Sequence, residues 1–255
     1  MMLSVLFMWV PFIFSLSVLG YVSVSDFKTR TVSNLVWLFA YPIGCAMTLV
    51  SVVFNLVGTS VVLVSLVCSM FLGLVLFFSG FYGSADVKAL IFIGLTLSVV
   101  PFIFTPIIGF FTLPPVLLVF CLSTILSLMW PLSIFVLNLA DLGKGKSLFE
   151  EIQLTLRQKL WLLFTVRRIP LIKFEGLRYF PAETVVIACE EEGGKPAKKL
   201  LRFVKAETNL QKYLDTLKEH SKLYPNGVLA SPTIPTMVFF TIALALVPVM
   251  NLFSL

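Results

Sequence analysis

Two aspartates, Asp26 and Asp86, are the acids whose positions suggest chemistry. They are the only acidic residues outside residues 141–225, and each adjoins an apolar run. A carboxylate at the end of a membrane helix is costly and usually faces a cavity or a partner. Two carboxylates at close range cannot both ionise easily, so they share one proton. One can then act as general base on water while the other polarises a peptide carbonyl, which predicts peptide hydrolysis.

The same residues have other interpretations. Lys28 or Arg30 can balance the charge of Asp26, and the helix dipole favours an acid such as Asp86 at a helix start. An ion- or proton-coupled membrane transporter also keeps acids in its helices, although the sequence has no inverted repeat or pair of broken helices. A non-catalytic membrane scaffold that acts through residues 141–225 would need neither acid.

The elements that must hold these acids are membrane helices. Apolar residues form 58% of the chain and charged residues 13%, with a mean hydropathy of +1.01, whereas charged residues form about 25% of a soluble domain. Six apolar runs are each near the ~20 residues that cross a bilayer. The predicted spans are 2–24, 32–54, 57–79, 86–104, 113–139 and 233–253. Pro131 predicts a tilt or kink in the fifth, and the small residues Gly73 and Gly94 predict close helix contacts.

The positive charges predict the orientation. Of 19 lysines and arginines, 16 lie within residues 141–225, and the others are Lys28, Arg30 and Lys88. With six spans all of them lie on one side, which the positive-inside rule makes the cytoplasm. We therefore expect a multi-pass plasma-membrane protein with its N-terminus outside and both aspartates at the cytoplasmic face. Because acids are interleaved with the bases, no nucleic-acid partner is expected.

A small α+β cytoplasmic domain is predicted before the last span. The expected division is 1–140 as the membrane core with five spans, 141–232 as the soluble domain and 233–255 as the sixth helix. A capping box from Ser147 to Glu150 predicts an amphipathic helix that reaches about Val166 and is apolar enough to lie on the membrane surface. The other predicted elements are strands at 184–189 and 200–204, a turn at Gly193-Gly194 and a helix at 208–222.

Cysteine and histidine usage indicates no metal or cofactor. The four cysteines are scattered without a C-x-x-C pair, and His220 is the only histidine. Neither a zinc site nor a histidine-dependent triad is therefore expected.

Both aspartates lie in motifs of a known family. Residues 83–88, Gly-Ser-Ala-Asp-Val-Lys, resemble the G-x-G-D motif of intramembrane aspartyl proteases. They are most similar to its G-x-[GA]-D-x-K form, which prepilin-type peptidases carry. Residues 26–34, Asp-Phe-Lys-Thr-Arg-Thr-Val-Ser-Asn, are similar to the D-x-[KR]-x-R-x-[VI]-x-N signature that follows their first span. An insertion before a last span that opens with Ser-Pro-Thr-Ile-Pro, residues 231–235, resembles the archaeal preflagellin peptidases in particular.

The resemblance implies a function for these residues. Asp26 and Asp86 would be the catalytic dyad, and Gly83 and Ala85 would let a substrate backbone approach. The other matched residues, to which the motifs give no firm role, are Lys28, Arg30, Asn34 and Lys88. The implied partners are membrane lipid and a protein substrate, preflagellin or another archaeal pilin-like precursor, with a short basic leader before an apolar helix. The paired C-x-x-C motifs of bacterial prepilin peptidases are absent, so no zinc or methyltransferase activity is implied.

Overall fold

The structure, a computed structural model, consists of two compact units. The residues it describes are 2–80, 82–99, 106–108, 111–112, 114–145, 148–149, 154–170, 179–186, 197–200, 215, 219 and 227–252. Met1–Ser127 with Pro235–Leu255 form the first unit, and Leu128–Ile234 form the second. The domain boundaries expected from the sequence, at residues 140 and 232, remain a prediction.

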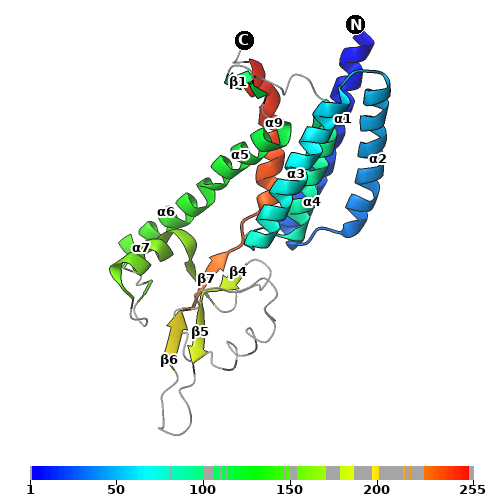
Figure 1. The fold of residues 1–255 in the computed structure, drawn as a ribbon. Helices are drawn as coiled ribbons and strands as arrows, with labels where there is room; N and C mark the ends of the chain where they lie inside the picture. Colours follow the sequence, from blue (N-terminus) through cyan, green and yellow to red (C-terminus); the bar gives the residue numbers. More distant parts are fainter. Residues whose placement is uncertain are drawn as a thin grey trace. The chain divides into compact units, whose positions relative to one another are not determined.

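The first unit is a bundle of helices in which α1 to α4 run side by side (Figure 1). Its helices are α1 (Met2–Thr29), α2 (Asn34–Val53), α3 (Thr59–Ser79), α4 (Ser84–Thr96), α5 (Pro115–Ser127) and α9 (Thr236–Leu252). Two short strands, β1 (Pro106–Ile108) and β2 (Phe111–Thr112), pair antiparallel. α2 begins after Ser33, whose hydroxyl accepts a hydrogen bond from the Leu35 N–H. α3 ends at Gly80, whose φ of +73° favours glycine.

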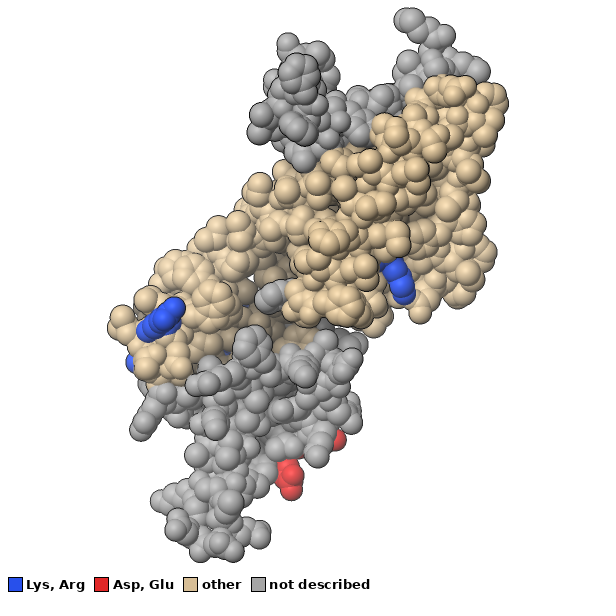
Figure 2. Space-filling model, viewed as in Figure 1, with Lys and Arg blue, Asp and Glu red and all other residues tan. Residues whose placement is uncertain are grey.

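Four helical segments are long and apolar enough to cross a membrane. They are Trp9–Thr29, Asn34–Val53, Thr59–Ser79 and Pro115–Gly143, and at most 33% of each is buried inside the protein. Figure 2 shows that uncharged side chains cover nearly all of the described helical surface in that view. Such an exposed apolar surface needs lipid around it, so this is a polytopic helical membrane protein. Six spans and the orientation remain predictions.

Several helices begin or end away from their predicted bounds. α1 continues to Thr29, so Asp26 lies inside the helix and not beyond it. α9 begins at Thr236, directly after Pro235, whose ring suits the start of a helix better than its interior. The predicted kink of the fifth span is an interruption at Leu128, between α5 and α6 (Met129–Gly143). It follows from Pro131, which has no N–H to offer to the carbonyl four residues earlier.

α4 is the central helix of the first unit and is shorter than predicted. It contacts α1, α2, α3, α5 and α9, and its Leu90, Phe92 and Ile93 are completely buried. The sequence predicts a span over 86–104, but α4 ends at Thr96 and continues as a 3₁₀ turn at Leu97–Val99. Thirteen helical residues measure only about 20 Å. The remainder of the predicted span, residues 100–104, lies outside the described chain.

Small residues bring α3 and α4 together, as Gly73 and Gly94 predicted. A Cβ on Gly94 would overlap both Cβ and Oγ of Ser69, and one on Gly73 would lie 3.0 Å from the Val87 Cγ1. The Ser65 hydroxyl donates a 2.7 Å hydrogen bond to the Gly94 carbonyl. Missing side chains and interhelical hydroxyl bonds are how helices associate closely within a membrane. The predicted close contact is confirmed at both glycines.

Gly94→Ala is expected to destabilise the bundle. The added methyl group overlaps Ser69, so the helices must separate, at a cost of about 1–3 kcal/mol in the free energy of unfolding. Thermal unfolding of the purified protein in detergent measures the change. Gly20→Ala is the matched control, since a Cβ there meets nothing within 4 Å. Equal transition temperatures for the two variants would contradict the close contact.

The second unit combines two helices with short strands. Its elements are α6, α7 (Leu156–Thr165), β3 (Arg167–Ile169), β4 (Tyr179–Pro181), β5 (Glu183–Val186), β6 (Ala197–Leu200) and β7 (Val228–Pro232). One antiparallel sheet has the order β3-β7-β4, and β5 pairs antiparallel with β6. The predicted hairpin pairing is present between β5 and β6, but β6 shares only Leu200 with the predicted strand 200–204, the rest of which lies outside the described residues. The Gly193-Gly194 turn lies outside the described residues, and of the predicted helix 208–222 only Asp215 and Glu219 are described, both helical.

The amphipathic helix of this unit begins later than predicted. Thr155 precedes α7 and forms a capping box with Gln158, whose Oε1 accepts from the Thr155 N–H at 2.9 Å. The predicted box of Ser147 and Glu150 lies on residues outside the described chain, and the described residues 148–149 between them form a bend. The helix therefore starts at the Thr155 capping box, which the sequence did not lead us to predict.

Candidate functional site

Asp86 lies in the first turn of α4, the central helix of the first unit. Asp86 is buried, with only 8% of its surface exposed. The Gly83 N–H donates to Asp86 Oδ2 at 2.9 Å, which satisfies one of the free N–H groups at the start of α4. The α4 dipole also favours a negative charge here. The helix-capping role weighed for Asp86 is therefore present, and it occupies one of the two carboxylate oxygens.

The second oxygen of Asp86 is held by α9. The hydroxyl of Thr236, the first residue of α9, donates a hydrogen bond to Asp86 Oδ1. Sequence reasoning missed Thr236, which lies one residue beyond the Ser-Pro-Thr-Ile-Pro segment at 231–235. The prolines of this segment predicted that a helix begins here. They did not predict which residue the first residue of that helix contacts.

Asp26 lies in the last turn of α1, within electrostatic range of Asp86. The charge of Arg30 and the main chain of Met237 also act on it. Its Oδ2 is buried and has no hydrogen-bond partner among the described residues. Buried polar atoms are rarely left unpaired in native proteins. The oxygen is thus a buried acceptor without a partner among the described residues.

The first turns of α9 connect the two helices that carry the acids. Thr236 contacts Asp86 on α4, and the adjacent Met237 interacts with Asp26 on α1. The Ser23 hydroxyl of α1 donates to the Met237 carbonyl at 2.7 Å and lies 2.6 Å from the Thr241 hydroxyl. These contacts tie α1 to α9, so the relative position of the two carboxylates depends on how α9 begins.

Tyr82 is a further residue near Asp86 that the motifs did not identify. Its ring packs against Phe120 of α5, with centroids 6.2 Å apart. Burial raises the pKa of the Tyr82 phenol, as does, to a smaller degree, the charge of Asp86. The phenol is therefore protonated at neutral pH and links the loop before α4 to α5.

The other motif residues occupy different places. Lys88 Nζ donates to the Asn34 Oδ1 at 2.7 Å, and the Tyr41 hydroxyl donates to the Lys88 carbonyl at 2.8 Å. These bonds join α2 to α4, and Lys88 and Asn34 are hydrogen-bonded to each other across the two helices. Arg30, at the end of α1, has a φ of +55° and acts on Asp26 through its charge.

The three remaining motif residues surround the helix ends. Lys28 is exposed in the last turn of α1, Gly83 is exposed before α4, and Ala85 is half-buried against the main core. A Cβ on Gly83 would lie 3.5 Å from the Asp86 Oδ2, an ordinary contact. Among the described residues, no group of three or more His, Cys, Asp or Glu side chains is placed to hold a metal.

Two interacting carboxylates can act as a coupled acid pair. Two carboxylates whose charges interact titrate together, and the pair can hold one proton between its members. Such a pair can accept a proton at one carboxylate and donate one from the other. Asp26 Oδ2 is the carboxylate oxygen of this pair that is left without a partner among the described residues.

Comparison with protein families gives one match. Residues 13–132 match the model of the type IV leader peptidase family. This range contains both aspartates and all six other motif residues, whereas Thr236 lies outside it. No curated protein matches the chain. A leader peptidase cleaves a protein substrate, so the match supports a protease. The resemblance to prepilin-type peptidases is thereby confirmed: residues 13–132 of this membrane protein match the type IV leader peptidase family.

Proposed function

We propose that this protein is a membrane aspartyl endopeptidase in which Asp26 and Asp86 form the catalytic pair. One observation carries the proposal: acids from two separate motifs lie within electrostatic range, and the first turn of α9 contacts both. The match to the type IV leader peptidase family supports the reaction class, because leader peptidases hydrolyse one peptide bond of a precursor.

The proposed reaction needs one protonated and one ionised carboxyl group. The ionised member takes a proton from water, and the resulting hydroxide adds to the scissile carbonyl while the protonated member donates to the carbonyl oxygen. The tetrahedral intermediate then collapses, and the proton taken from water passes to the leaving amine. Asp26 Oδ2, buried and unpaired among the described residues, would receive the water after a helix movement exposes it, and Thr236 and Gly83 hold Asp86 in position.

The proposed substrate is a preflagellin or another pilin-like precursor. Its leader is short and basic, and an apolar helix follows it. Cleavage at their junction requires an extended backbone, whose freed polar groups need water and therefore an interfacial position. Asp26 lies in the last turn of α1 and Asp86 in the first turn of α4. These positions are consistent with both acids at the same membrane face. The positive charges favour the cytoplasmic face.

Co-expression with candidate precursors tests this function. Membranes that contain the protein and a precursor are analysed by gel mobility and by mass spectrometry of the product. We expect shortening by the length of the leader, with a new N-terminus where the apolar helix begins. A precursor whose leader lysines and arginines are replaced by serine is the control and should be cut more slowly. Intact precursors of every kind, beside a correctly inserted protein, would contradict the proposal.

A further inference from the structure

α7 in the second unit has apolar side chains on two sides. Leu162 is buried and packs with Val166 and Leu229 in a small core. On the other side Leu156, Leu160 and Trp161 are 78%, 53% and 70% exposed. A surface helix of a soluble domain buries one apolar stripe and turns polar residues outward. The second apolar side of α7 therefore needs an environment other than water.

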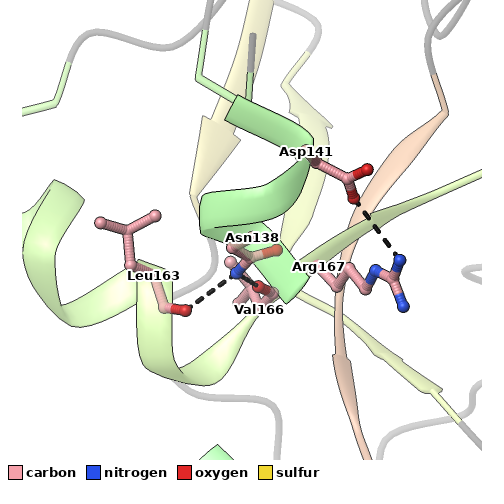
Figure 3. Close-up of polar contacts among 5 residues, drawn as sticks. All are labelled: Asn138, Asp141, Leu163, Val166 and Arg167. Carbon is pink, nitrogen blue, oxygen red and sulfur yellow. Dashed lines mark hydrogen bonds and ion pairs between the residues drawn. The ribbon is translucent and has the colours of Figure 1, made fainter. Parts of the chain in front are cut away.

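α7 is held firmly on α6 (Figure 3). Asn138 of α6 is 1% exposed, and its Nδ2 donates to the carbonyls of Leu163 and Val166 at 2.8 and 2.7 Å. These carbonyls belong to the end of α7, where helices leave such groups without internal partners. The rings of Phe135 and Phe164 stack at 4.3 Å. An ion pair of 3.4 Å between Asp141 of α6 and Arg167 joins the following strand, β3, to α6 as well.

The place of α6 in a candidate membrane span indicates that lipid covers the exposed side of α7. It is the second part of the candidate membrane span Pro115–Gly143, and its Leu132, Val136 and Leu139 side chains are exposed. Phe135 and Asn138, the α6 residues that hold α7, lie near the end of that span. The end of a span is where hydrocarbon gives way to lipid headgroups. Tryptophan is enriched at this depth, and Trp161 is the aromatic residue that α7 exposes.

The polar residues of α7 also suit a helix at the level of the lipid headgroups. Arg157 and Lys159 are exposed, and α7 contains no acid. Long basic side chains lay their stems along apolar surface and place their charge at lipid phosphates. Basic residues near the cytoplasmic leaflet also attract anionic lipids. The combination of exposed apolar residues and unopposed basic ones is that of an interfacial helix.

We propose that α7 lies in the headgroup region of the bilayer, with Leu156, Leu160 and Trp161 in the lipid and with Arg157 and Lys159 at the phosphates of anionic lipids. It would fix the second unit to the membrane surface through α6. The proposal does not depend on protease activity, because α7 and the two aspartates belong to different units.

Site-specific fluorescence quenching of the full chain tests the proposal. The four native cysteines are replaced by serine, and a single cysteine is introduced by Trp161→Cys or, as the matched control, by Lys159→Cys. The two positions are about 200° apart around α7. Each variant is labelled with an environment-sensitive dye and placed in nanodiscs of phosphatidylcholine and phosphatidylglycerol. Spin-labelled lipid should quench mainly the dye at position 161, and aqueous iodide mainly the dye at position 159.

Two outcomes would overturn the proposal. Equal quenching of both dyes by iodide would mean that this side of α7 faces water. Protection of the dye at position 161 from both quenchers would mean that protein covers it, such as a second copy of the chain.

A second measurement needs no cysteine replacement. Native mass spectrometry compares the wild type with the variant Arg157→Gln/Lys159→Gln, both taken from the same nanodiscs. The variant should lose bound phosphatidylglycerol and retain phosphatidylcholine. Unchanged retention of phosphatidylglycerol would contradict the assignment of these two residues to lipid phosphates.

Discussion

Asp86→Asn is expected to abolish cleavage of a leader-bearing precursor, with a loss of at least about 1,000-fold in kcat/KM, and Asp26→Asn is expected to do the same. An amide is nearly isosteric with the carboxyl group but cannot take up or release the proton that the reaction needs. Purified protein in detergent and a precursor of known sequence give the rate, with product size as the readout.

The fold should survive these substitutions, so that the loss reports chemistry. The asparagine that replaces Asp86 keeps an oxygen that accepts from the Gly83 N–H or from the Thr236 hydroxyl, the two donors that hold the native carboxylate. Asp141→Asn is the matched control: that acid pairs with Arg167 in the second unit, and a partly exposed pair contributes about 0–1 kcal/mol. The control should cleave at the wild-type rate.

The double variant Asp26→Asn/Asp86→Asn sharpens the test. Residues that act as one unit give losses that do not add, so the double variant should be no slower than either single variant. If either single variant cleaves near the wild-type rate, the two aspartates are not a catalytic pair. Additive losses would instead mean that each acid acts independently.

Local patterns in the sequence predicted the parts of this fold that depend on local physics. Apolar runs located the helices because a membrane helix must satisfy its own backbone and face lipid. Gly73 and Gly94 predicted close approach because a missing Cβ matters in any helix pair. Asp26 and Asp86 were conspicuous because charge near a bilayer is costly, whatever its neighbours are.

Other features depend on contacts or competitions that a local pattern does not contain. α4 ends at Thr96, within an apolar run that continues beyond it, so apolar character alone did not predict where the helix ends. The strands β3, β4 and β7 have three to five residues each, too few for an alternating pattern to stand out. The Thr236 hydroxyl meets an aspartate 150 residues earlier in the chain. Proline spacing indicated the start of a helix there, and only the packing of α9 on α4 determines its partner.

Thr236→Val should lower kcat about 10- to 100-fold and leave KM almost unchanged, because the hydroxyl positions Asp86 and is not expected to bind substrate. Valine has the shape of threonine but offers no donor, so Asp86 Oδ1 loses its partner and the carboxylate is free to rotate. Initial rates over a range of precursor concentrations separate the two constants. Thr236→Ser restores the hydroxyl and should recover most of kcat.

A general effect of α9 on stability must be distinguished from this positioning role. Thr241→Val removes another hydroxyl of the same helix, one that contacts Ser23 of α1 and not an aspartate. If Thr236 only holds α9 in place, both valine variants lose stability and activity together, and serine at position 236 offers no special recovery. If Thr236 orients the catalytic carboxylate, kcat falls for Thr236→Val alone. The second result is expected, because consecutive residues at the start of α9 act on both acids, whereas Thr241 lies more than one helical turn further along.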